Sequence, residues 1–158
     1  SMAIPVTHWW GQWHDFEYLN NHIDFYNAMT YGTHGNWSSH AGHLSPLYPS
    51  PPGDPDGSCH SNMFYLHNTR GIPKNKINMG IPFWGINWQA SNINENFTGI
   101  TSDIMYYDIP ELIGNGWSYF WDNDALCPYL LKNDETQIIT YENSESIKFK
   151  CEYVLQEQ

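Results

Sequence analysis

Three histidines, His34, His40 and His43, lie close together in a stretch rich in glycine, serine and proline. Imidazole nitrogens are common ligands of zinc and other transition metals, so the cluster is a conceivable metal site. Two Asp-x-Asp pairs, at 54–56 and 122–124, add carboxylates, but neither follows an apolar strand, and both are interpreted as turns. A serine nucleophile is not indicated, because no Gly-x-Ser-x-Gly sequence occurs.

Aromatic side chains form a second group of candidate ligand-binding residues. They make up 16% of residues, with 8 Trp and 11 Tyr, and asparagines accompany them. Flat aromatic faces stack against sugar rings, while amides and carboxylates bind hydroxyl groups. The composition therefore fits a carbohydrate-binding surface, and it also fits a core built from large aromatic residues.

The charge balance excludes several classes of partner. The net charge is −11, from 17 acidic against 6 basic side chains, which disfavours binding to nucleic acids and to anionic membrane surfaces. No segment approaches the roughly 20 apolar residues of a membrane span. The three cysteines match no zinc pattern, and no cofactor is expected. The 158 residues suffice for one domain, but a complete (β/α)8 barrel typically takes about 250.

The elements that must position these residues alternate between strand and helix. Short apolar runs predict buried strands, and helical spacing predicts helices between them, which together indicate parallel βαβ units. The expected strands cover 2–6, 25–31 and 77–85, and the expected helices cover 15–23 and 63–71. Residues 32–62 are predicted to form one long loop, a feature that is usually functional or disordered.

After residue 88 the pattern changes. Strand-like pieces at 104–107 and 137–141, separated by turn residues, predict a small α+β insertion. The last segment has apolar residues at helical spacing from Ile147 onward. Asn143 and the serines after it are suitable capping residues, so this segment is predicted to be a helix.

Five motifs occur in a fixed order along nearly the whole chain, and together they resemble the family 18 glycoside hydrolases, which include chitinases and chitinase-like lectins. Residues 24–31 are similar to the family's sixth barrel strand, which carries a Met-x-Tyr-Asp motif, and residues 34–37 and 42–48 are similar to the loop after it. Residues 76–85 are similar to the seventh strand, with its Pro-Phe-Tyr-Gly pattern. Parts of 97–129 resemble the insertion domain, and 141–147 resemble the turn before strand eight.

The resemblance implies a fold class: an α/β protein, namely a partial (β/α)8 TIM barrel with a small α+β chitinase insertion domain. We expect residues 1–88 to form barrel strands five to seven, 89–142 the insertion domain, and 143–158 the barrel helix that precedes a missing eighth strand. A second chain or a missing segment would supply the rest of the barrel. An incomplete barrel exposes strand edges, which also predicts a partner or self-association.

The resemblance also implies a set of site residues. Tyr31 matches the catalytic tyrosine that stabilises the acetamido oxygen of the substrate. The remaining matches are expected to bind substrate: Met29, Gly32 (where the family has Asp), Trp37, Trp84 (where it has Tyr) and Asp108 (where many members have Glu). Since His34 and His43 belong to the family's loop pattern, no metal is expected.

The family's reaction is substrate-assisted retaining hydrolysis of β-1,4-linked N-acetylglucosamine polymers, in which the sugar's N-acetyl group attacks the anomeric carbon. The general acid is the Glu of an Asp-x-x-Asp-x-Asp-x-Glu motif, which this chain lacks. We therefore expect a segment of a chitinase-like hydrolase that binds chitin oligosaccharides but is inactive alone. The alternatives are a non-catalytic carbohydrate-binding protein and a fragment with a structural role. A secreted or extracellular location is expected.

Overall fold

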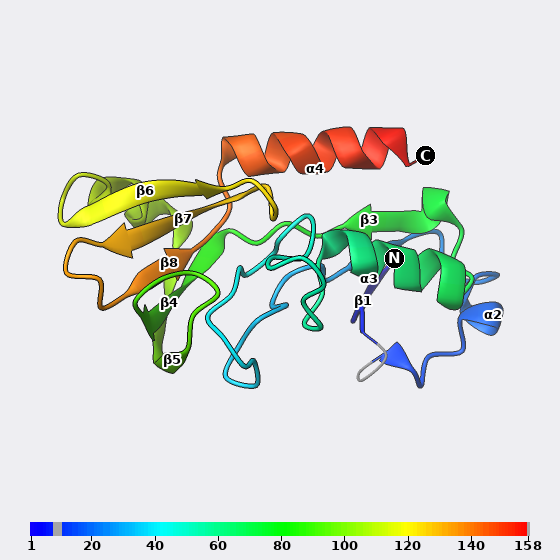
Figure 1. The fold of residues 1–158 in the computed structure, drawn as a ribbon. Helices are drawn as coiled ribbons and strands as arrows, with labels where there is room; N and C mark the ends of the chain where they lie inside the picture. The colour runs from blue at the N-terminus through cyan, green and yellow to red at the C-terminus, as the bar shows by residue number, and fades with distance from the viewer. Residues whose placement is uncertain (8–10, 158) are drawn as a thin grey trace.

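The computed structural model describes residues 1–7 and 11–157. Within these ranges the chain forms a three-stranded and a five-stranded β-sheet, joined by helices and a long loop (Figure 1). The fold is therefore of the mixed α/β kind that the sequence predicts. Across the same residues, no helix is both long and apolar enough to cross a membrane.

The first sheet is parallel, in the order β1–β2–β3. Its strands are short: β1 is Met2–Ile4, β2 is Tyr26–Ala28 and β3 is Ile77–Met79. Parallel neighbours require crossover connections, and here these contain helices. The first crossover holds α2, Phe16–Leu19, whose N-cap Asp15 accepts a hydrogen bond from the Tyr18 amide. The second holds the long loop, α3 (Cys59–Phe64) and the π-helix η1 (Tyr65–Thr69), and η2 (Lys74–Lys76) precedes β3.

The second sheet is antiparallel, in the order β5–β4–β8–β7–β6. Its strands are β4 (Trp84–Ala90), β5 (Phe97–Met105), β6 (Trp117–Asp122), β7 (Cys127–Lys132) and β8 (Ile138–Thr140). Two 3-10 helices, η3 (Tyr106–Asp108) and η4 (Pro110–Leu112), connect β5 to β6. Trp88, Leu130 and Ile138 are fully buried in this part of the molecule.

The chain closes with α4, Ser144–Gln156, which runs from the antiparallel sheet toward the parallel one (Figure 1). Asn143 caps the helix: its side chain accepts from the amides of Glu145 and Ser146, and the Ser146 side chain accepts from the Asn143 amide. This reciprocal capping confirms the predicted helix start.

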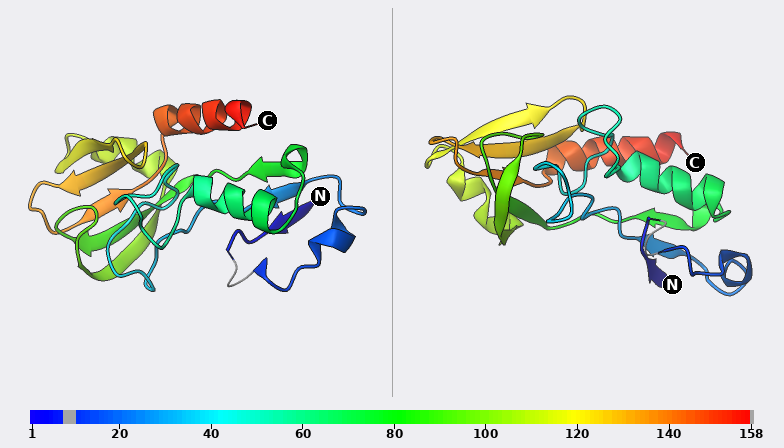
Figure 2. Two further views of the ribbon diagram at one scale, coloured as in Figure 1. Left: turned by 45° about the vertical axis from the view of Figure 1, so that its right-hand side comes forward. Right: turned by 60° about the horizontal axis from the view of Figure 1, so that its bottom comes forward.

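The long segment between β2 and α3 lies between the two sheets in both views of Figure 2. It contains no regular element, yet residues 41–47 are all buried. Two of its backbone hydrogen bonds go to turns of the antiparallel sheet: Ala41 N donates to Glu95 O at 2.9 Å, and Leu47 N donates to Ala125 O at 2.9 Å. We call residues 29–58 the interlayer loop.

Several predicted boundaries differ from the structure. The strand predicted at 77–85 is divided: β3 ends at Met79, and Trp84 begins β4 of the other sheet. Proline lacks a backbone donor, so Pro82 disfavours continuation of the β3 ladder. The helix predicted at 63–71 begins earlier, at Cys59, where Ser58 and Ser61 form a capping box. The antiparallel sheet thus begins within the range assigned to the barrel, and the division into domains stays a prediction.

Candidate functional site

Tyr31 follows β2, at the carboxyl end of the parallel sheet. Its neighbours are fixed in place by hydrogen bonds: Met29 N donates to Ile4 O at 3.0 Å, and Thr30 Oγ1 donates to Gly80 O at 2.8 Å. Gly32 N donates to Leu44 O at 2.8 Å. The Tyr31 backbone is therefore held between β1, the residue after β3 and the interlayer loop.

The Tyr31 ring meets Trp84 edge-to-face, with ring centroids 5.1 Å apart and an interplanar angle of 75°. Gly80 permits this position, because a Cβ there would lie 2.9 Å from Tyr31 Cε1. Both aromatic side chains are half-buried. Among the described residues the Tyr31 hydroxyl makes no hydrogen bond, so it is free to donate to a ligand. We call Tyr31 and Trp84 the aromatic pair.

The other predicted site residues are more dispersed. Met29 is half-buried, whereas Gly32 is exposed with φ +69° and has open space where a side chain would be. Trp37 is 72% exposed and covers Gly35, and Asp108 is exposed in η3. Among the described residues, no ring contact or side-chain hydrogen bond joins these four to the aromatic pair. Their assignment to one site stays a prediction.

Further exposed aromatic residues surround the start of β4. Phe83 is 68% exposed and its carbonyl accepts from Tyr106 N at 3.2 Å, which brings η3 beside the aromatic pair's strand. Trp84 itself pairs with Met105. Tyr107 is also largely exposed. Neither Phe83 nor Tyr107 is among the predicted site residues, although both lie in segments that carry the family resemblance.

A second group of polar residues lies within the interlayer loop. His34 Nε2 is 2.7 Å from Asp54 Oδ2, and both side chains are fully buried. His40 Nε2 is 3.3 Å from the same oxygen, and Asp56 Oδ2 is 3.8 Å from His34 Nε2. Burial lowers the pKa of His34, and this outweighs the opposing attraction of Asp54. Asp54 Oδ1 accepts from Asp56 N at 3.0 Å, as the predicted turn requires. We call these four residues the histidine–aspartate cluster.

The third histidine of the loop faces the antiparallel sheet. His43 Nε2 lies 3.0 Å from Asp122 Oδ2, and Ser50 Oγ donates to the same oxygen at 2.6 Å. Burial alone would raise the pKa of Asp122, but these two hydrogen bonds outweigh it, so the pKa of this carboxyl lies below its usual value. The second Asp-x-Asp pair thus ties the loop to the end of β6.

Asp122 should give the chain an acid-sensitive part of its stability. A carboxylate whose pKa is lower in the folded chain stabilises folding above its unfolded pKa, about 3.9, and loses that contribution as the pH falls toward the folded value. We expect Asp122→Asn to lower the free energy of unfolding at pH 7 and to weaken its decline below about pH 4. Urea titrations at pH 7 and pH 3 measure this. Asp103→Asn, on an exposed position of β5, should behave like the parent chain; equal pH profiles for all three chains would contradict the assignment.

A buried ion pair lies on the other side of the loop. Lys150 Nζ of α4 is 2.8 Å from Glu142 Oε1, and it donates to Ser45 O at 2.6 Å and to Ser45 Oγ at 2.8 Å. Burial alone would lower the pKa of Lys150, but the acidic groups around it, Cys59 and Glu142, raise it. Glu142 is thus buried and paired with a cation, and it is unsuited to act as a general acid toward a substrate.

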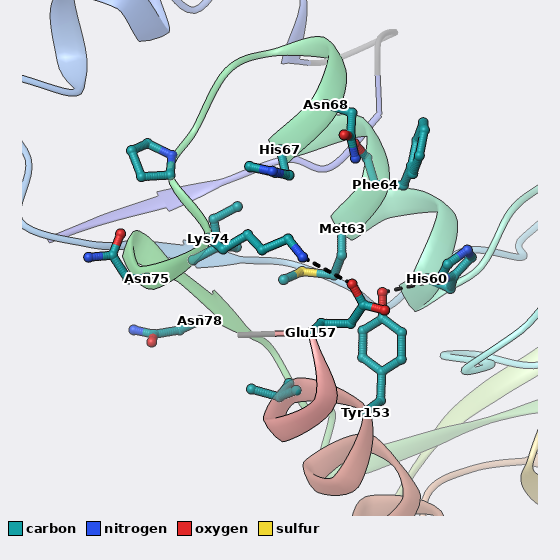
Figure 3. Close-up of a pocket in the computed structure, with 13 residues that line it drawn as sticks. His60, Met63, Phe64, His67, Asn68, Lys74, Asn75, Asn78, Tyr153 and Glu157 are labelled. Carbon is teal, nitrogen blue, oxygen red and sulfur yellow. Dashed lines mark hydrogen bonds and ion pairs between the residues drawn. The ribbon is translucent and has the colours of Figure 1, made fainter.

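A pocket of about 1130 Å³ lies between α3, η2 and α4 (Figure 3). Lys74 and Glu157 form an ion pair of 3.1 Å across it, and His60 hydrogen-bonds to Tyr153 at 3.1 Å. The pocket is at the amino end of β3, whereas Tyr31 follows the carboxyl end of β2. This pocket is therefore separate from the aromatic pair.

Comparison with known proteins gives consistent results. The family model for glycosyl hydrolases family 18 matches residues 1–158. A probable endochitinase of Caenorhabditis elegans is 31% identical over 159 residues, covering 91% of this chain and 25% of that protein. An oviduct-specific glycoprotein of Ovis aries is 26% identical over 158 residues, covering 91% of this chain and 28% of that protein. The solved structure of a family 18 N-acetylglucosaminidase from Paenibacillus barengoltzii matches with a TM-score of 0.87 and 25% identity, over 98% of this chain and 47% of that one.

These matches define a chitinase-like protein. The chain belongs to the glycosyl hydrolases family 18. It spans about a quarter of the length of the curated relatives named above and about half of the solved enzyme.

Proposed function

We propose that this chain forms part of a cleft that binds oligosaccharides of N-acetylglucosamine, the units of chitin. The aromatic pair carries the proposal. It lies at the carboxyl side of a parallel sheet, it offers a flat indole face, and it has a hydroxyl that makes no hydrogen bond among the described residues. In this proposal β1, β2 and β3 correspond to barrel strands five, six and seven of the family, and the antiparallel sheet corresponds to its insertion domain.

The chemistry assigned to each residue follows from its side chain. Tyr31 donates a hydrogen bond to the acetamido oxygen and so holds this oxygen in position to attack the anomeric carbon. Trp84 packs against the face of the same sugar. Gly32 supplies no carboxylate where the family has one, and Glu142 is paired with Lys150. The proton for the leaving group must come from a second chain or a further segment, so the chain alone is expected to bind without turnover.

The binding residues can be tested individually. Tyr31→Phe removes one hydrogen bond, worth about 0.5–1.5 kcal/mol, and should weaken binding of an N-acetylglucosamine tetramer about two- to twelvefold. Trp84→Ala removes the stacking face and should weaken binding by about tenfold or more. Titration calorimetry measures both effects. Tyr18→Phe, at an exposed position of α2, is the matched control and should bind as the parent does. Unchanged affinity in both site variants would refute the proposal.

A non-catalytic carbohydrate-binding protein is the second candidate, and Gly32 is the observation that favours it. Hydrolysis assays on the assembled protein distinguish the two. Turnover of a chitin oligosaccharide would exclude the binding-only function, whereas tight binding without turnover would exclude the hydrolase. Turnover by the isolated chain would contradict the requirement for a further acid.

The same proposal includes a macromolecular partner and a location. Within the described residues, β1 and β3 are the outer strands of the parallel sheet, and exposed strand edges are surfaces on which further strands add. A second chain or segment that supplies the remaining barrel strands would cover them. We propose a secreted or extracellular protein, since chitin is an extracellular polymer, and the net charge of −11 gives no support for nucleic-acid binding.

A further inference from the structure

We propose that the histidine–aspartate cluster of the interlayer loop binds a divalent transition-metal ion, with zinc as the best match. The ligands would be His34 Nε2, His40 Nε2 and Asp54 Oδ2, and Asp56 is placed to complete the set. The three principal ligand atoms lie within 4.8 Å of one another. This inference does not depend on the proposed glycan site.

The hydrogen bond of His34 Nδ1 determines which nitrogen of the neutral ring is free to bind a metal ion. His34 Nδ1 lies 2.9 Å from the His43 carbonyl oxygen, and because a carbonyl only accepts, Nδ1 carries the hydrogen. In the neutral ring, Nε2 then presents a lone pair to Asp54 Oδ2, which is 2.7 Å away. A lone pair that faces a carboxylate oxygen at this distance needs a proton or a metal ion that both atoms share, so the contact is one at which a metal ion can bind.

Unpartnered atoms point to a cation at the same place. His40 Nε2 is buried and lies 3.3 Å from Asp54 Oδ2, but it makes no hydrogen bond. Asp56 Oδ2 is likewise a buried atom without a hydrogen bond, 3.8 Å from His34 Nε2. Buried polar atoms in proteins are normally satisfied, so two such atoms beside the His34–Asp54 contact indicate a shared ligand.

The outer contacts orient the ligands as metal sites require. His34 is held by the His43 carbonyl, Asp54 Oδ1 accepts from the Asp56 amide, and His40 Nδ1 lies 3.2 Å from Ser39 Oγ. Metal-bound histidines usually make such a hydrogen bond through the second ring nitrogen.

The donor set selects the class of metal. Two imidazole nitrogens with carboxylate oxygens suit zinc, whereas calcium and magnesium prefer oxygen ligands alone. Tetrahedral ligands with metal bonds of about 2.0–2.2 Å lie about 3.3–3.6 Å apart. The His40–Asp54 distance of 3.3 Å already matches this spacing. The shorter His34–Asp54 distance would open slightly when the ion enters.

A metal here would cross-link the two halves of the interlayer loop. His34 and His40 come from its first part and Asp54 and Asp56 from its proline-rich second part, with Trp37 between the two histidines. His40, Asp54 and Asp56 also lie outside the positions that carry the family resemblance. The site would therefore combine His34, which belongs to the loop pattern of the family resemblance, with residues outside that pattern.

The test is a titration of the chelator-treated chain, produced without a histidine tag, with Zn²⁺. Calorimetry is expected to show one saturable equivalent, and the melting temperature is expected to rise with Zn²⁺ concentration. His40→Ala should weaken Zn²⁺ binding about 10–100-fold or more, and Asp56→Asn should weaken it less. Co²⁺ in place of Zn²⁺ should give the visible absorption of a tetrahedral site, and His40→Ala should abolish it.

His22→Ala is the matched control, because His22 is an exposed histidine in the first crossover of the parallel sheet, between α2 and β2. It should bind Zn²⁺ as the parent does. His40 is partly exposed, so His40→Ala should fold, and its circular dichroism spectrum and melting temperature without zinc verify this. The proposal is overturned if the parent shows no saturable equivalent, if folded His40→Ala binds as tightly as the parent, or if His22→Ala weakens binding equally.

Discussion

Lys150→Met is expected to destabilise the chain by about 3–5 kcal/mol, the typical cost of breaking a buried ion pair. The side chains of Lys150 and Glu142 are 1% and 2% exposed. Without the ammonium group, the Glu142 carboxylate keeps only the hydrogen bonds from Ser146 Oγ and Cys127 Sγ in a buried site. Urea-induced unfolding followed by tryptophan fluorescence measures the loss of free energy.

An exposed pair on the same helix provides the control. Lys148 and Glu152 lie 3.8 Å apart with side chains 72% and 48% exposed, so Lys148→Met should cost less than about 0.5 kcal/mol. Replacing both partners of the buried pair, as in Lys150→Met/Glu142→Leu, should recover part of the loss, because no unpaired charge then remains. A cost below about 1 kcal/mol for Lys150→Met alone would contradict the assignment.

Gly42→Ala should destabilise the chain by about 1–3 kcal/mol or more. A Cβ at position 42 would overlap the His34 ring, which is fully buried and held by Asp54. The ring cannot move aside without losing that contact, and overpacking of a buried site has a cost of this order. The measurement is again the free energy of unfolding in urea.

Gly99→Ala provides the comparison for this substitution. The nearest atom to a Cβ at position 99 is Gln89 Oε1 at 3.5 Å, which is an ordinary contact. Gly99→Ala should therefore change stability little, and it should leave Zn²⁺ binding intact. If Gly42→Ala is as stable as Gly99→Ala, the described packing of His34 is incorrect.

Helix caps and hydrophobic spacing, which depend only on residues close in the sequence, predicted the helices α2 and α4. The cap Asn143 and the apolar spacing after Ile147 predicted α4, and the helix predicted at 15–23 contains α2, because capping and periodicity act within a few residues. The strands β6 and β7 were not predicted. None of the β6 residues is buried, so the strand lacks the alternation that distinguishes a half-buried strand. The burial of the interlayer loop depends on partners far along the chain, which local patterns do not contain.

The two candidate sites also differ in how far sequence motifs could predict them. Tyr31 and Trp84 belong to motifs that resemble a known family, and the structure brings them into contact. The histidine–aspartate cluster has no recognisable spacing, because His40 and Asp54 meet only through the path of the loop. Sequence reasoning noted the histidines and interpreted Asp54 and Asp56 as a turn. That turn is present, but it also aims a carboxylate at His34.

The interlayer loop has a consequence for how the chain reaches its native state. Lys150 and Ser45 are separated by 105 residues, and His43 and Asp122 by 79. Contacts of such long range slow folding, because the intervening chain must be ordered before they can form. During synthesis, the loop cannot bury Ser45 until α4 has emerged. Its amide hydrogens should consequently become protected from exchange together with α4 rather than with the neighbouring strand β2.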